Sequence, residues 1–270
     1  MALPAGCHGK SHHNLQDNTL RYGRRMGSIS TSVKSLTEPV GYVGGHWMLH
    51  PEVLAPCRDA GYPHGYAYYV AGRGGVLGDV DSDVIAASFG FFEPSLVRLM
   101  WDLGVAVEGA AASAARYGGA CAQFGRLRLA GFDGATRVSE LAGRVADGVE
   151  ITGLPLFAGW RAQPRPDDAP GRAALLMHVL RELRCGVHLV AVVATGLGPR
   201  RAVFATGGAA SAKQYGWAEP FNDLADTSKA PAEDLTDEIL TRLYSAVLSG
   251  DEAAELARLV ADMRSHFDTR

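Results

Sequence analysis

The sequence predicts an all-α protein, a compact multi-helix domain with a C-terminal helical hairpin and a flexible N-terminal tail. Long Ala-rich segments place apolar residues three and four positions apart, which is the period of an amphipathic helix. Proline and glycine separate these segments where helices begin and end. Segments that alternate apolar and polar residues are scarce, which argues against a sheet. With 270 residues, 47% of them hydrophobic, the chain is long enough for one large core.

Residues 1–28 differ from the rest because they mix Gly, His, Asn and Arg with almost no apolar periodicity. This composition is typical of a flexible tail. Its histidines, His8, His12 and His13, resemble a metal cluster only superficially, since no ordered scaffold would hold them. A start at Met26 would explain the segment equally well. We therefore predict a tail over 1–28 and a single helical domain over 29–270.

The first half of this domain is predicted to consist of short helices. After SVKSLTEPV, the segment HPEVLAPCRDAG carries Pro51 where a first helical turn accepts it. HGYAYYVAGRGG ends at the glycine pair Gly74-Gly75. The segments DSDVIAASFGF and EPSLVRLMWDLG open on acidic or capping residues. Each of these segments is therefore interpreted as one helix.

The second half of the domain is predicted to contain longer helices. Residues 105–130 and 135–148 are Ala-rich with spaced charges, which favours closely packed helices joined by the turn AGFDGATR. Helices are expected over 153–163 and 169–197, on either side of the breaker PRPDDAP. Within the latter, GVHLVAVVATG is rich in β-branched residues, but no second strand is present to pair with it, so a helix is favoured. The hairpin follows at about 234–268, with its turn at Ser249-Gly250.

Composition limits the function classes. The 26 Lys and Arg residues and 29 Asp and Glu residues give a net charge of −3, so no overall positive field attracts nucleic acid, and specific binding to it is disfavoured. The four cysteines, Cys7, Cys57, Cys121 and Cys185, are isolated, as in the reduced thiols of a cytoplasmic protein. No apolar run approaches the length of about 18 residues that a membrane span requires, and the N-terminus lacks a secretory apolar region. We expect a cytoplasmic protein with no membrane partner.

The segment 174–197 carries ionisable side chains into an apolar stretch. On a helix, one third of the circumference holds a polar arc consisting of His178, Arg181, Glu182, Cys185 and His188. Such an arc is either solvated or structurally paired, or it lines a ligand site, because buried charges need partners. We predict that Arg181, Glu182 and His188 form one partly buried cluster facing a pocket. Arg181 and Glu182 lie about 100° apart and need not pair with each other, and each is expected to reach a partner on another helix.

A second candidate is the stripe formed by Tyr62, Tyr66, Tyr69 and Arg73 at positions i, i+4, i+7 and i+11 of a helix. Aromatic stripes usually pack in the core, with the hydroxyl tips hydrogen-bonded. Alternatively, the tyrosines bind an aromatic or polyketide-like ligand whose carboxylate is held by Arg73. The sequence leaves both interpretations open.

His46 follows the pair Gly44-Gly45, where the backbone can approach a neighbouring element closely, and is either a general base or a packed turn histidine. The motifs of hydrolases, dinucleotide enzymes and zincins (G-x-S-x-G, G-x-G-x-x-G after a strand, and HExxH) are missing from the sequence. The spacing of His178, Glu182 and Cys185 matches no recognised zinc pattern. We therefore expect neither a metal nor a cofactor.

Several blocks occur in an order that resembles a known family. They are GYPHGYAYYVAGRGGVLGDVDSDVIAASFGFFEPSLV, GLPLFAGW, LLMHVLRELRCGVHLVAVVATGL and the pair Gly216-Trp217. Over about residues 38–218 the chain resembles helix-turn-helix-like proteins common in actinobacterial genomes, a family without an agreed biochemical role. Leu183 stands where that family tends to have a histidine, and an acidic helical pair follows residue 234 where many members have a winged-helix-like region. Both departures weaken the DNA-reading role that the family label implies.

Two functions follow from these observations. The first is a cytoplasmic protein that binds a small organic molecule of specialised metabolism, or transforms it by acid–base chemistry without a metal or dinucleotide. Its candidate catalytic residues are His188, Glu182 and His46, and its candidate ligand-binding residues are Arg181, Tyr66, Tyr69 and Arg73. The alternative is a ligand-responsive transcriptional regulator, but glycines interrupt the best candidate recognition helix, GPRRAVFATGGAASAKQYGW. The sequence favours the first function and leaves homodimer formation open.

Overall fold

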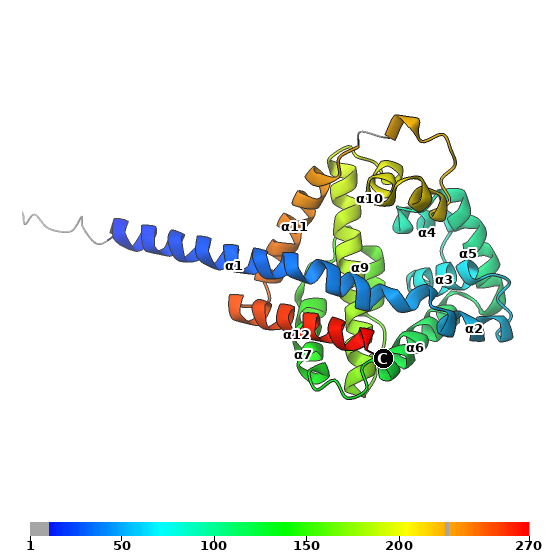
Figure 1. The fold of residues 1–270 in the computed structure, drawn as a ribbon, viewed down its shortest axis with the longest axis horizontal. Coiled ribbons are helices and arrows are strands. Elements are labelled where there is room, and N and C mark those ends of the chain that lie inside the picture. The colour runs from blue at the N-terminus through cyan, green and yellow to red at the C-terminus, as the bar shows by residue number, and fades with distance from the viewer. Residues whose placement is uncertain (1–10, 225–226, 270) are drawn as a thin grey trace, which may run out of the picture.

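The structure, a computed structural model, describes residues 11–224 and 227–269, with side chains from residue 27 onward. All regular elements in this part of the chain are helices, which confirms the predicted all-α class (Figure 1). In chain order the α-helices are α1 (Ser11–Gly45), α2 (Pro51–Asp59), α3 (Gly65–Gly74), α4 (Ser82–Phe89), α5 (Pro94–Glu108), α6 (Ala110–Arg128), α7 (Ala135–Gly148), α8 (Pro155–Arg161), α9 (Ala169–Ala194), α10 (Pro199–Gln214), α11 (Ala230–Ser245) and α12 (Gly250–Asp268). The short 3₁₀ helices are η1 (His46–Leu49), η2 (Gly75–Leu77) and η3 (Asn222–Leu224).

Helix α9 lies at the centre of the molecule and packs against α1, α6, α7, α8, α10 and α11. Its first turn is capped by Asp168, whose carboxylate accepts a hydrogen bond from the Gly171 amide at 2.9 Å. Every side chain from Ala173 to Leu180 is buried, so the helix is apolar around most of its circumference there. The β-branched segment at 186–194 continues the same helix, which confirms the prediction of helix over strand.

The C-terminal end of helix α1 crosses α9 (Figure 1). The contact is close: a Cβ at Gly44 would lie 2.4 Å from the carbonyl oxygen of Met177. A Cβ at Gly45 would lie 2.8 Å from Nε of Arg181. The predicted close approach of the backbone at the glycine pair is therefore confirmed, and α9 is the element it approaches.

The N-terminal segment 1–28 falls into two parts. Residues 1–10 lie outside the described part of the chain, as does the side chain of each histidine at positions 8, 12 and 13. From Ser11 the backbone is part of α1, whose N-terminal portion extends away from the other helices (Figure 1). The packed portion begins at Ile29, whose side chain is fully buried. The expected boundary at residue 28 thus lies inside a helix, at the point where α1 meets the core.

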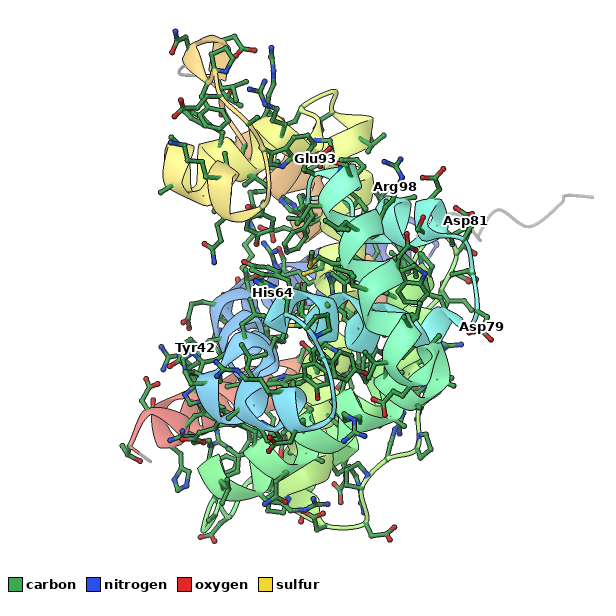
Figure 2. The ribbon with its side chains drawn as sticks, turned by 90° about the vertical axis from the view of Figure 1, so that its right-hand side faces the viewer. Tyr42, His64, Asp79, Asp81, Glu93 and Arg98 are labelled. Atoms are coloured by element: carbon green, nitrogen blue, oxygen red, sulfur yellow. The ribbon has the colours of Figure 1, made fainter. Side chains whose placement is uncertain are left out.

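Capping side chains begin the three helices α3, α4 and α5. The Nδ1 atom of His64, a carboxylate oxygen of Asp81 and one of Glu93 each accept a hydrogen bond from the first turn of the helix that follows. Figure 2 labels these three residues on the face of the molecule where the helices start. The amide of Glu93 also donates to the carbonyl of Tyr215 at 2.8 Å, which joins the start of α5 to the end of α10.

Two segments differ in detail from their predicted form. The stretch 105–130 is divided between α5 and α6 because Gly109 adopts a φ of 80°, which leaves the helical region. The predicted C-terminal pair is present as α11 and α12, and Ser249 and Glu252 form a capping box at the start of α12. Both helices pack on α1, while α11 also contacts α9 and α12 also contacts α7.

No helix in the described residues combines the length and apolar character needed to cross a membrane. The cysteines Cys57, Cys121 and Cys185 are free thiols, as expected. Cys7 lies outside the described residues.

Candidate functional site

A buried carboxylate, that of Glu182 on α9, is held by two guanidinium groups. Arg73 of α3 donates from Nε to Oε1 and from Nη2 to Oε2, both at 2.8 Å, in the two-point geometry that matches a carboxylate. Arg181 donates from Nη1 to Oε1 at 2.9 Å. The side chain of Glu182 is 1% exposed and that of Arg73 is 6% exposed, whereas that of Arg181 is 21% exposed. Of the three side chains, only that of Arg181 is therefore partly exposed to solvent.

Three aromatic residues fix the position of Arg73. The hydroxyl of Tyr69 accepts a hydrogen bond from its Nη1 at 3.1 Å, and the ring of Phe89 lies 4.5 Å from its guanidinium carbon. The indole of Trp160 donates to the Arg73 carbonyl at 3.0 Å. The arginine is thus positioned by α3, α4 and α8 together, and has little freedom to move.

The surroundings keep Glu182 ionised. Burial on its own raises the pKa of a carboxyl group, but the guanidinium charges of Arg73 and Arg181 outweigh burial and bring the pKa of Glu182 to about 2. A carboxylate held in this way is a poor proton acceptor near neutral pH, because protonating it would break the pair. The geometry favours a binding or structural role for Glu182 over the role of general base.

His178 lies one helical turn before Glu182 and is completely buried. Its Nδ1–H donates to the carbonyl of Gly44 at 3.2 Å, and its ring meets Trp47 and Trp160 edge to face at 5.2 and 4.5 Å. Nε2 has no hydrogen-bond partner among the described residues. Burial lowers the pKa of His178 to about 4, so the imidazole is neutral at neutral pH.

A pocket of about 510 Å³ opens above the Arg73–Glu182 pair. Its floor is formed by these two residues together with Cys185 of α9. Its walls come from α4, the start of α8 and α9 and are mainly apolar, with Phe89, Leu154, Phe157 and Leu189 among them. Ser88 and Asp83 of α4 also line the pocket, and the Asp83 carboxylate is exposed and paired with Arg98. A concave apolar space with a few fixed polar groups is the usual form of a small-molecule site.

Four of the sequence-predicted residues meet at this site, namely Arg73, Tyr69, Arg181 and Glu182. Glu182 reaches a partner on another helix, Arg73 of α3, as expected, but Arg181 does not, because it bonds to Glu182 itself. The two side chains are long enough to bridge the 100° between neighbouring helix positions.

The tyrosine stripe is only partly formed, because α3 begins at Gly65 and Tyr62 precedes it. The Tyr62 hydroxyl instead bonds to Glu108 at 2.7 Å and Ser113 at 2.8 Å. Tyr66 lies next to Tyr69, with ring centroids 6.3 Å apart, but its hydroxyl is directed to the carbonyl of Gln214 at 3.5 Å.

His188 belongs to a different cluster, so the prediction of one group with Arg181 and Glu182 is wrong. Its Nδ1 lies 2.9 Å from Oγ1 of Thr236 and its Nε2 lies 3.9 Å from Glu233, both on α11. Its ring stacks on Phe91 at 5.7 Å. The six positions from Glu182 to His188 carry the chain nearly two helical turns along α9, which takes His188 out of reach of Arg73.

His46 lies apart from both groups. It is an exposed residue of η1 that stacks on Tyr42, with ring centroids 4.7 Å apart. Burial and the nearby His50 lower its pKa. The three residues predicted as catalytic, His188, Glu182 and His46, are therefore not brought together by the fold.

Sequence reasoning missed the pocket walls and the burial of His178. A usable signal was nevertheless present, since the blocks that carry the family resemblance converge here. The block containing residues 82–91, the block GLPLFAGW and the α9 block supply the walls and much of the floor. The fourth block is close by, because the indole of Trp217 donates to the carbonyl of Phe91 at 2.9 Å.

Comparisons with known proteins place the chain at the level of a family. No curated protein matches it, and no solved structure matches it. The sequence profile of a helix-turn-helix family matches residues 32–227, which include α3, α4, α8 and α9 and thus every element around the pocket. The chain belongs to this helix-turn-helix family.

Proposed function

We propose that the protein binds a small organic molecule in the pocket between α4, α8 and α9. The observation that carries the proposal is the combination of apolar walls with a rigid ionic floor, formed by Arg73 and Glu182. A volume of about 510 Å³ is within the range of small-ligand sites. The ligand would bury apolar surface against Phe89, Leu154 and Phe157, at about 25 cal/mol for each Å² removed from water.

The proposal is for binding rather than turnover. An acid–base mechanism needs a proton acceptor and a proton donor within reach of one bound molecule. Glu182 is occupied by two guanidinium groups, while His188 and His46 lie in separate surroundings. The arrangement therefore supports recognition of a ligand better than proton transfer to it.

A neutral fluorescent probe tests this function. N-phenyl-1-naphthylamine is an apolar molecule small enough for the pocket, and it fluoresces strongly when it leaves water. We expect saturable binding of one molecule per chain. Ala87→Trp should abolish binding, because Ala87 is an exposed residue that lines the pocket and a tryptophan there would fill it.

Ala112→Trp is the matched control, since Ala112 is also exposed on a helix but does not line this pocket. It should bind the probe as the unmodified protein does. Equal binding by the Ala87→Trp variant, or no saturable binding by the unmodified protein, would contradict the proposal.

A second candidate function is ligand-responsive regulation of transcription, which the family membership favours. In that case the pocket would be the effector site. Helix α10, which forms most of the candidate recognition segment, gives little support to a role in regulating transcription. In α10, Gly207 and Gly208 leave the helical region, while Lys213 contacts Glu219 at 2.6 Å and Arg200 lies 3.9 Å from Asp223. A kinked helix whose basic groups face carboxylates is poorly suited to a DNA groove.

A further inference from the structure

The cluster below the pocket contains more positive than negative charge. Arg73 and Arg181 share the single carboxylate of Glu182. Within the described part of the chain, neither guanidinium forms an ion pair with a second carboxylate. Two positive charges and one negative charge leave a surplus of one positive charge.

The neighbouring groups do not remove this surplus. Tyr69 contributes a hydroxyl that accepts a hydrogen bond from Arg73. His178 donates from Nδ1 to a backbone carbonyl, and its Nε2, 4.0 Å from Oε1 of Glu182, has no hydrogen-bond partner among the described residues. Because burial lowers the pKa of His178 to about 4, the imidazole is neutral near pH 7 and adds no charge. The net charge of the cluster is therefore set by the two arginines and Glu182. Asp83, the other carboxylate that lines the pocket, is exposed and is paired with Arg98.

The surplus positive charge lies in a largely buried cluster, where water solvates it only weakly. Arg73 and Glu182 are almost fully buried, and the Arg181 side chain is 21% exposed. An unmatched charge in such surroundings raises the free energy of the molecule, and a counter-charge bound beside it lowers that free energy. In addition, the hydrogen bonds from Arg73 to the described residues use three of its five N–H groups. The pocket thus lies over a positive centre that has hydrogen-bond donors left.

We propose that the ligand of this pocket is an organic monoanion, a mainly apolar molecule with one carboxylate or similar acidic group directed at Arg73. The inference rests on the proposed function and specifies its ligand class. The apolar walls receive the body of the molecule, and the surplus charge selects the acidic group. Arg73 accordingly serves two carboxylates, that of Glu182 and that of the ligand.

The test compares two probes that differ in one group. 8-Anilinonaphthalene-1-sulfonate is N-phenyl-1-naphthylamine with an added sulfonate, so the ratio of their affinities isolates the contribution of the negative charge. Arg181→Met removes the surplus charge, and Arg181 does not line the pocket, so its walls stay the same. We expect the preference for the anionic probe to fall about tenfold, which is the effect of one charge several ångströms away in partly buried surroundings.

Arg181→Lys keeps the charge and should keep the preference. If Arg181→Met does not fold, Arg181→Gln makes the same change in charge while retaining a donor for Glu182. Ala87→Trp reports any binding of either probe outside the pocket. An unchanged affinity ratio in the neutral variants would overturn the anion inference while leaving the proposed function intact. Failure of the neutral probe to bind the unmodified protein would instead overturn the proposed function.

Discussion

Glu182 is the residue on which the buried cluster depends, because it is the counter-charge of two arginines. Glu182→Gln would leave Arg73, 5% exposed, without a negative partner. Breaking one side of a buried ion pair costs about 3–5 kcal/mol, and we expect a loss of that size in the free energy of unfolding. Urea unfolding measures it.

The matched control is Asp262→Asn, which removes the partner of Arg258 in a pair whose side chains are both more than half exposed. Exposed pairs of this kind contribute about 0.5 kcal/mol or less. A similar change in unfolding midpoint for the two variants would show that the buried carboxylate is not essential to stability.

His178 makes stability depend on pH. Its pKa is lowered from 6.5 to about 4 in the folded protein, so below pH 6.5 the unfolded chain binds a proton that the folded chain does not. Stability should therefore fall as the pH decreases from about 6.5 to about 4, by up to about 1.4 kcal/mol for each pH unit. The carboxyl of Glu182, with a pKa lowered from 4.5 to about 2, adds a second loss below pH 4.5.

The dependence of the free energy of unfolding on pH tests whether His178 is the responsible group. In His178→Gln, the free energy of unfolding measured between pH 7 and pH 5 should fall less steeply than in the unmodified protein, whatever the absolute stability of the variant. The control His266→Gln changes a half-buried histidine on α12 whose Nε2 lies 3.0 Å from the carbonyl of Ala130. Equal slopes in the unmodified protein and His178→Gln would mean that His178 is not the group that resists protonation.

Single residues of the site were partly predictable from the sequence. Arg73, Arg181 and Glu182 stood out because they are charged residues in apolar segments. The pairing of Arg73 with Glu182 was not predictable, since 109 positions separate the two residues and no local pattern fixes how two helices meet. His188 shows the opposite error, because a shared helical face does not place two residues in the same cluster when they are nearly two turns apart.

At the scale of elements, the kink at Gly207 and Gly208 in α10 corresponds to the interruption predicted from the glycines of this segment. Gly208 has φ 62° and ψ −156°, a region that residues with a Cβ rarely adopt, although no atom lies within 4 Å of its missing Cβ. Gly208→Ala should therefore destabilise the protein by about 1–3 kcal/mol through backbone strain alone. Thermal unfolding is a suitable measurement.

Gly119→Ala provides the comparison, since Gly119 lies within α6 with open space around its Cβ position and no positive φ. That substitution should stabilise the protein by about 0.4–1 kcal/mol, because alanine restricts the unfolded chain. Stabilisation by both substitutions would show that the kink in α10 is not imposed by Gly208.

The helices themselves were largely predictable, and their ends less so. The caps and prolines located the starts of α2, α5 and α9, where a single side chain decides the boundary. The helix break at Gly109 was not predictable, because a single glycine in an Ala-rich segment is compatible with a continuous helix. The start of α1 was placed too late, because its first turns lack the apolar periodicity by which a packed helix is recognised.

At the scale of the whole molecule, arginines in different parts of the chain are paired with carboxylates across the surface. Examples are Arg126 with Asp168, Arg137 with Glu255, and Arg165 with Asp147. These pairs join neighbouring elements and leave little unbalanced positive charge for phosphate groups, in agreement with a net charge of −3.

Duplex DNA should therefore bind weakly and without sequence preference. Titration of labelled promoter fragments at moderate salt, with and without a pocket ligand, measures this directly. Sequence-dependent affinity in the nanomolar range would contradict the prediction and favour the regulator hypothesis. Loss of that affinity on adding the anionic probe would assign the pocket as an effector site.

The contact of Trp47 and Trp160 with His178 gives the protein an optical signal at its centre. Two of the four indoles face one imidazole, and their N–H groups donate to the carbonyls of Gly44 and Arg73. Their emission therefore depends on the junction of α1 and α9 and on the backbone that carries the pocket arginine. We therefore expect intrinsic fluorescence, without any attached dye, to follow the integrity of the core around His178.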